Sequence, residues 1–93
     1  MAKLTSDQIG AALATTPGWN RQNDSIERTF AHKDFLAAMA FVNKVAALAE
    51  AAGHHPDIDI RWNKVTLTLS THSEGGLTQK DIDLARQING LSS

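Results

Sequence analysis

Two runs of alternating apolar and polar residues constrain the fold of this chain more than any other feature. Residues 57–62 are Asp-Ile-Asp-Ile-Arg-Trp, and residues 65–70 are Val-Thr-Leu-Thr-Leu-Ser. Alternation with a period of two predicts β-strands, and the two intervening residues, Asn63 and Lys64, predict a hairpin turn. One face of the hairpin is expected to be buried, and the other to face water. The residues expected on the buried face are Ile58, Ile60, Trp62, Val65, Leu67 and Leu69.

A helix and a second hairpin are predicted before this one. Thr5 and Gln8 have the spacing of a capping box, and Leu4 and Ile9 that of a hydrophobic staple, so a helix should begin here and run to about Thr15. Pro17-Gly18 should end that segment. Residues 19–21 and 25–31 are then expected to be two short strands around a turn at residues 22–24.

The longest predicted helix covers Lys33 to Ala52 and ends at Gly53. Apolar residues recur at helical spacing on a stripe that we expect to face the sheet. The stripe consists of Phe35, Ala38, Met39, Val42, Val45, Ala46 and Ala49. Phe41 and Leu48 flank this stripe beside Lys44, so the helix has more apolar surface than one small sheet needs. No stretch approaches the roughly 18 apolar residues of a membrane span.

A last helix is predicted after Gly75-Gly76, where Thr78 to Asp81 form a second capping box. Its inward residues should be Leu84, Ala85, Ile88 and Leu91. The element order is therefore α-β-β-α-β-β-α. Hairpins separated by helices predict an α+β fold, a four-stranded antiparallel sheet with three helices packed on one face.

Length and charge limit the classes of protein that this chain can belong to. With 93 residues, we expect one domain over 1–93. The formal net charge of -1 gives no general attraction to nucleic acid. The sequence has no cysteine, which excludes disulfides and thiolate metal sites. The N-terminus lacks the apolar core of a signal peptide, so we expect a cytoplasmic protein without a membrane partner.

Three histidines lie where predicted elements end. His54 and His55 follow the long helix, and His72 follows the last strand. The ordinary pKa of histidine, about 6.5, lets the imidazole both donate and accept a proton near neutral pH. If these side chains converge, they suit acid/base chemistry on a small molecule.

Simpler interpretations remain open for each of these residues. A histidine pair before proline is often only a polar loop, and Glu50 is typical of a solvated surface acid. Asp81 could serve only to cap its helix. Zinc is a chemical alternative, since three imidazoles and a carboxylate would suffice for a catalytic site. Adjacent histidines in extended backbone point apart, however, and no His-x-x-x-His pair is present, so we expect no metal.

Several segments together resemble the pterin-4a-carbinolamine dehydratase family. The resemblance lies in an acid, a histidine pair, an aromatic residue, a third histidine and an aspartate, in order and with the family's spacing. The segments are Glu50 to Pro56, Trp62 to Val65, Leu67 to His72, Gly76 to Thr78, and Asp81. A looser similarity includes Gly18-Trp19 and residues 30–35 and extends over nearly the whole chain.

The resemblance implies dehydration of 4a-hydroxytetrahydropterin to the quinonoid dihydropterin, in recycling of the pterin cofactor of aromatic amino acid hydroxylases, without metal or organic cofactor. His54 and His72 match the family's acid/base histidines, and His55 matches a histidine that holds the pterin. Substrate contacts are then also expected from Glu50, Trp62 and Asp81. Gly53 and Ile58 depart from the family pattern, which has an acid and an aromatic residue there.

Other roles remain open beside catalysis. The family resemblance also implies a transcription-coactivator or dimerisation module as an alternative, and a member that binds pterins without turnover is a third possibility. Because the long helix has surplus apolar surface, we expect a homodimer or a dimer of dimers, with Phe41 and Leu48 in the interface.

Overall fold

The computed structural model describes residues 2–91 and has the predicted order of helices and strands. The helices are α1 (Ser6–Ala14), α2 (Phe35–Ala52) and α3 (Gln79–Asn89). The strands are β1 (Asn20–Gln22), β2 (Ser25–Ala31), β3 (Asp57–Arg61) and β4 (Lys64–Leu69), and a 3₁₀ turn, η1, covers His72–Glu74. The predicted α+β fold with an antiparallel sheet is therefore confirmed.

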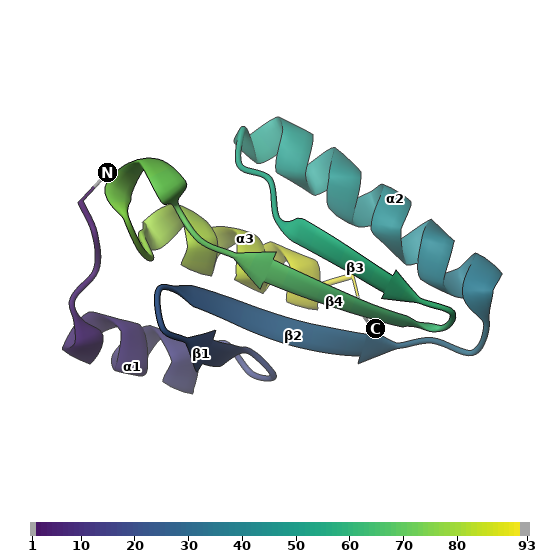
Figure 1. Cartoon of the computed structure of the whole chain (residues 1–93), viewed down its shortest axis with the longest axis horizontal. Helices are drawn as coiled ribbons and strands as arrows, with labels where there is room; N and C mark the ends of the chain where they lie inside the picture. The colour runs from purple at the N-terminus through teal and green to yellow at the C-terminus, as the bar shows by residue number, and fades with distance from the viewer. Residues whose placement is uncertain (1, 92–93) are drawn as a thin grey trace.

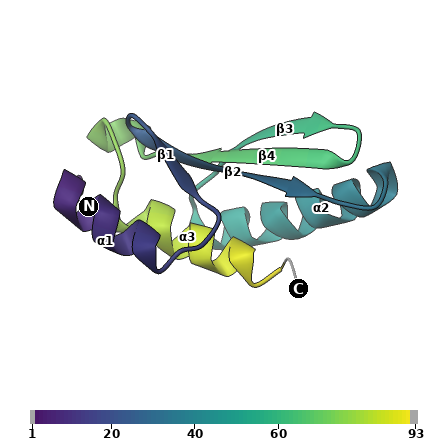
Figure 2. The same ribbon diagram turned by 90° about the horizontal axis from the view of Figure 1, so that it is seen from below.

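The sheet has the strand order β1-β2-β4-β3, and every pair is antiparallel (Figure 1). Figure 2 shows all three helices on one side of the sheet. The central strands β2 and β4 carry the buried residues that meet the helices, whereas β3 is an edge strand. The chain therefore forms two layers with one apolar core between them.

Helices α1 and α3 begin with the predicted capping boxes, whereas α2 begins at Phe35 and not at Lys33. In α1 the Thr5 amide donates to Gln8 Oε1 at 2.8 Å, and the Gln8 amide donates to Thr5 Oγ1 at 3.2 Å, which completes the predicted capping box. Asp34 caps α2 through the amide of Ala37 at 2.8 Å. In α3 the residues expected inward, Leu84, Ala85 and Ile88, are buried, and Leu91 is half-buried.

The buried face of α2 differs from the predicted stripe. Phe41, expected on an outer flank, is only 5% exposed, and its ring centroid lies 4.7 Å from that of Phe30. Leu48 is also packed against the core, whereas Phe35 is exposed. Because the large ring of Phe41 fills the space beneath β2, the helix turns this side inward with Ala38, Val45 and Ala49. The expectation that Phe41 faces another subunit was therefore wrong, and Leu48, which is half-buried, is available for such a contact only in part.

The second hairpin also differs in its turn and in the burial of one strand. Arg61 pairs with Lys64, so the turn is Trp62-Asn63 rather than Asn63-Lys64. Asn63 Nδ2 donates to the carbonyl of His32, which holds the turn to the end of β2. Val65, Leu67 and Leu69 are buried as expected. On β3, Ile58 and Ile60 remain 39% and 37% exposed and Trp62 is 65% exposed, because an edge strand lies beyond the main helix contacts.

Helix α2 begins two residues after the predicted start at Lys33, and it is more apolar than the expected absence of a membrane span implies. Its 18 residues have a mean hydropathy of 1.5, and within the described residues it alone meets a length-and-composition test for a membrane span. The core helix of a globular domain can meet the same test, and Ala38, Phe41, Val45 and Ala49 are buried against the rest of the chain. The test is thus weak evidence for a membrane.

The Arg28 side chain packs closely against Gly18 and connects the first hairpin to Asn89 at the end of α3. Gly18 has a φ of 88°, and a Cβ there would lie 2.6 Å from Arg28 Nε. Arg28 cannot move away cheaply, because its Nη1 donates to Asn89 Oδ1 at 2.7 Å and to the carbonyl of Pro17 at 3.2 Å. Its guanidinium also lies 4.3 Å from the Phe30 ring centroid.

We predict that Gly18→Ala lowers the free energy of unfolding by about 1–3 kcal/mol, because it combines a left-handed backbone with a displaced Arg28. The measurement is equilibrium urea unfolding. Gly10→Ala is the matched control, since Gly10 lies within α1 and a methyl group there would meet no atom within 4 Å. That control should raise stability by about 0.5–1 kcal/mol. Equal effects of the two substitutions would contradict the prediction.

Candidate functional site

His54 and Asp81 form a largely buried pair between the end of α2 and the start of α3. His54 Nε2 lies 2.5 Å from Asp81 Oδ1, and the two side chains are 11% and 0% exposed. Gly53 ends α2 in the left-handed region, with a φ of 62°, and the His54 amide then bonds to the carbonyl of Ala49 at 3.1 Å. This glycine termination turns His54 back under the helix, towards α3.

The second oxygen of Asp81 is held by two threonines. Asp81 Oδ2 accepts the hydroxyl of Thr71 at 2.8 Å and the backbone N–H of Thr78 at 2.9 Å. The two threonine hydroxyl oxygens are themselves 2.8 Å apart. Thr71, Thr78 and Asp81 are all buried. Asp81 therefore caps α3, as the simpler interpretation proposed, and also contacts His54.

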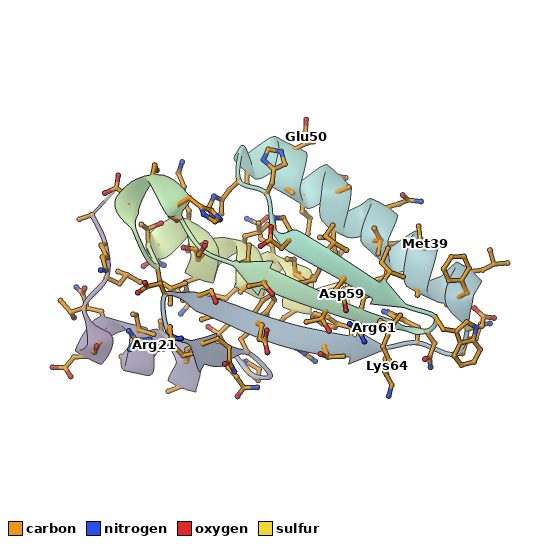
Figure 3. All side chains as sticks on the ribbon, viewed as in Figure 1. Arg21, Met39, Glu50, Asp59, Arg61 and Lys64 are labelled. Atoms are coloured by element: carbon orange, nitrogen blue, oxygen red, sulfur yellow. The ribbon has the colours of Figure 1, made fainter. Side chains whose placement is uncertain are left out.

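His55 and Glu50 form a second histidine–carboxylate pair, on the surface. His55 Nε2 contacts Glu50 Oε2, and the side chains are 62% and 77% exposed. Glu50 lies in the last turn of α2 (Figure 3), so the helix end and the residue after His54 bring the two together. Solvent around this pair weakens its electrostatic interaction, in contrast to the His54–Asp81 pair.

His72 opens the 3₁₀ turn after β4 and lines a polar cleft. The cleft has a volume of about 350 Å³ and is bounded by residues 22–25 of the β1–β2 turn, with Ser70, His72, Gly75 and Gly76 on the opposite side. His72 directly follows Thr71, whose hydroxyl reaches Asp81. His54 does not line this cleft, and its connection to His72 runs through Asp81 to Thr71 and then along the backbone.

Within one chain, the structure does not bring Trp62 to the histidines. Trp62 lies in the β3–β4 turn with a φ of 50°, at the opposite end of β3 from His55. Five residues of strand separate them, about 16 Å at roughly 3.3 Å per residue. In Figure 3, Glu50 lies at the C-terminal end of α2, whereas Arg61 and Lys64 lie lower and to the right, beside the β3–β4 turn. A substrate contact by Trp62 stays a prediction.

Three features of the site were not predicted from the sequence. They are Thr71, the β1–β2 turn that lines the cleft, and the contact of Asp81 with His54. Thr71 lies one residue beyond the alternating run 65–70, at a position that continues the buried face of Leu67 and Leu69. A hydroxyl at a buried-face position, directly before a candidate histidine, was the available signal. Over residues 2–91, no group of three or more His, Asp or Glu side chains has an arrangement that could hold a metal ion.

The fold and these side chains define an α+β domain that holds one buried and one exposed histidine–carboxylate pair, with a third histidine in a polar cleft. The profile of the family described as "Pterin 4 alpha carbinolamine dehydratase" matches residues 2–91. A Nocardia farcinica protein is 60% identical over 89 residues, covering 96% of this chain and 94% of the relative. That relative bears the name pterin-4-alpha-carbinolamine dehydratase provisionally. The chain therefore belongs to the pterin-4a-carbinolamine dehydratase family.

Two solved structures share the fold. A Brucella melitensis protein described as a transcriptional coactivator/pterin dehydratase superposes with a TM-score of 0.94, is 38% identical, and covers 98% of this chain and 99% of its own. A pterin dehydratase-like protein identified as a RuBisCO assembly factor in the alpha-carboxysome has a TM-score of 0.66 at 24% identity, with coverage of 81% and 87%. The second likeness shows the fold alone.

We predict that the two histidine–carboxylate pairs differ strongly in their contribution to stability. Asp81→Ala should lower the free energy of unfolding by about 2–4 kcal/mol, because it leaves buried hydroxyl, amide and imidazole groups without their acceptor. Glu50→Ala, at an exposed pair, should change it by less than about 0.5 kcal/mol. Urea unfolding of both variants measures the difference. Similar losses would show that burial of Asp81 does not matter.

Proposed function

We propose that this protein removes water from 4a-hydroxytetrahydropterin to give the quinonoid dihydropterin, with His54 and His72 as the proton-transfer pair. Membership of the dehydratase family supports the reaction class. The observation that carries the mechanism is the buried His54–Asp81 pair, which is linked through Thr71 to the segment that bears His72. The proposal requires no metal and no organic cofactor.

The reaction needs two proton transfers. The hydroxyl at C4a leaves as water after it receives a proton, and the adjacent ring nitrogen N5 loses a proton as the C4a–N5 double bond forms. Two imidazoles can perform both steps near neutral pH. A buried carboxylate against one imidazole fixes its ring orientation and stabilises the cation that forms when it accepts a proton. The His54–Asp81 pair has this arrangement.

The polar cleft beside His72 supports a site for the substrate. Its volume, about 350 Å³, is at the small end of the range for small-molecule pockets. Amide, hydroxyl and carboxylate groups of residues 22–25 face it, and such groups match the donors and acceptors of a pterin ring. His55 and Glu50 do not line this cleft, and the proposal that they also hold the substrate is supported by their exposure to an incoming ligand. We infer a cytoplasmic location, consistent with the absence of cysteine.

We predict that His54→Ala and His72→Ala each lower kcat by about 10²- to 10⁴-fold, because each removes one general acid/base group. The assay follows the absorbance of enzymatically generated 4a-hydroxytetrahydropterin with and without protein. His32→Asn is the control, since His32 lies at the end of β2 and packs on Phe41. Full activity in both single variants would refute the assignment.

A second candidate function is a coactivator or dimerisation module. It is favoured by the 38% identical structural relative, which is described as both transcriptional coactivator and pterin dehydratase. The two functions separate experimentally, because a binding role should survive His54→Ala and His72→Ala. Co-purification of a DNA-binding partner with the double variant, together with an inactive wild-type protein in the dehydratase assay, would favour this second candidate.

We also infer that the chain assembles at least as a homodimer. Large apolar side chains are exposed at the N-terminal end of α2 and along β3 and its turn, namely Phe35, Leu36, Ile58, Ile60 and Trp62. Edge strand β3 offers backbone donors and acceptors beside them. A second copy of this chain would cover the exposed apolar side chains and the free edge of β3, and a symmetric contact would add stability to a small domain.

We predict that Leu36→Asp with Trp62→Asp weakens self-association at least about tenfold while the monomer stays folded, because both side chains are mostly exposed. Sedimentation velocity across a concentration series measures the association. Lys44→Asp, at a polar position of α2, is the control for added negative charge. A wild-type protein that sediments as a monomer at micromolar concentration would rule out the assembly.

A further inference from the structure

We propose that Thr71 and Thr78 are positioning residues that act through Asp81 to make Nδ1 of His54 the proton acceptor of the reaction. The inference deepens the proposed function and rests on it for its kinetic consequence. Its structural part, the position of a proton on His54, stands on the hydrogen bonds alone.

The hydroxyl protons of the two threonines can be assigned by counting. Thr71 has one hydroxyl proton, and it is donated to Asp81 Oδ2 at 2.8 Å. The contact of 2.8 Å between Thr71 Oγ1 and Thr78 Oγ1 must then use the proton of Thr78. A directed chain results, in which Thr78 donates to Thr71 and Thr71 donates to Asp81.

The same count assigns the proton between Asp81 and His54. Oδ2 already accepts two donors, the Thr71 hydroxyl and the Thr78 backbone N–H at 2.9 Å. Asp81 is thereby held as an acceptor, and its other oxygen, Oδ1, faces His54 Nε2 at 2.5 Å. A neutral imidazole bonded in this way has its proton on Nε2 and a lone pair on Nδ1.

Burial of these residues restricts the orientation of the Asp81 carboxylate. Asp81 and Thr78 are 0% exposed and Thr71 is 8% exposed, so bulk water cannot readily replace a lost hydroxyl. Thr78 is fixed as the residue that begins α3, and Thr71 is held by backbone hydrogen bonds with Gly76 in both directions. The orientation of the Asp81 carboxylate, and through it that of His54, is therefore set by rigid backbone on both sides.

This position of the proton on His54 decides which histidine acts as the base and which as the acid. Nδ1 of His54 carries the lone pair and removes the ring proton, which leaves His72 as the group that protonates the departing hydroxyl. When His54 becomes a cation, Asp81 faces it with a carboxylate oxygen and stabilises the charge. Loss of one of the two donors to Oδ2 should let the carboxylate turn and weaken this support.

The test begins with the proton position in the wild-type protein. Nitrogen-15 NMR of histidine-labelled protein above pH 8 distinguishes the two imidazole tautomers, and the His54 signals are assigned by their loss in His54→Asn. We expect a protonated Nε2 and a non-protonated Nδ1 for His54. A proton on Nδ1 in the wild-type protein would overturn the proposal without any use of the activity assay.

The second measurement compares Thr71→Val, which removes the hydroxyl at nearly constant shape, with Thr71→Ser, which keeps it. Thr71→Val should give mixed His54 tautomers and lower kcat about tenfold, as expected for loss of a hydrogen bond to a charged group, with KM changed less than about twofold. Thr71→Ser should keep the wild-type tautomer and restore kcat. Thr29→Val is the control, because the hydroxyl oxygens of Thr29 and Thr66 are also 2.8 Å apart, on the exposed face of the sheet and without a contact to Asp81.

The outcomes separate this proposal from the proposed function. A folded Thr71→Val protein with the wild-type tautomer and wild-type kcat would overturn the positioning role. If Thr71→Val does not fold, a Thr71→Ser protein with mixed tautomers would overturn it instead, and retention of the wild-type tautomer there would support it. If the tautomers respond as expected but the wild-type protein does not dehydrate the pterin, the proton assignment stands and the proposed function fails.

Discussion

The carboxylate of Asp81 is the group on which the arrangement of this molecule's site depends. It is completely buried, and its two oxygens form hydrogen bonds with Thr71 just after β4, with Thr78 at the start of α3 and with the histidine that follows α2. A buried carboxylate is costly unless it is fully satisfied. The three segments must therefore keep their relative positions if the carboxylate is to remain inside, and this requirement ties the geometry of the site to the fold.

The rest of the fold supplies the rigid surroundings that this interaction needs. Strand β4 is central in the sheet, and its buried Val65, Leu67 and Leu69 fix its position against the helices. The buried face of α3 holds Thr78 and Asp81 at the first turn. Gly53 allows the chain to leave α2 in a left-handed conformation that directs His54 inwards. An ordinary L-residue at this φ of 62° would be strained, which gives a physical reason for the glycine.

The two histidine pairs show how environment separates chemically similar groups. His54 meets a carboxylate out of contact with water, so its ring has one orientation and its partner contributes strongly to any charged state. His55 meets Glu50 where both are solvated, so the pair can rearrange around a ligand at little cost. A fixed histidine and an adaptable one are thus adjacent in the sequence, and their different burial is what allows the different roles that we propose for them.

The sequence by itself determined the element order, the antiparallel sheet, the caps at Thr5 and Thr78, and the family motif, because each depends on residues close together in the chain or on a short repeat. It did not determine which side of α2 is buried, since Phe41 and Phe35 are both aromatic and only packing against Phe30 decides between them. It placed Trp62 in a buried strand face, whereas pairing of Arg61 with Lys64 put this residue in an exposed turn. Only the tertiary structure joined Asp81 to both His54 and Thr71. Those contacts span 27 and 10 residues, and they form because helix and strand ends meet at one edge of the core.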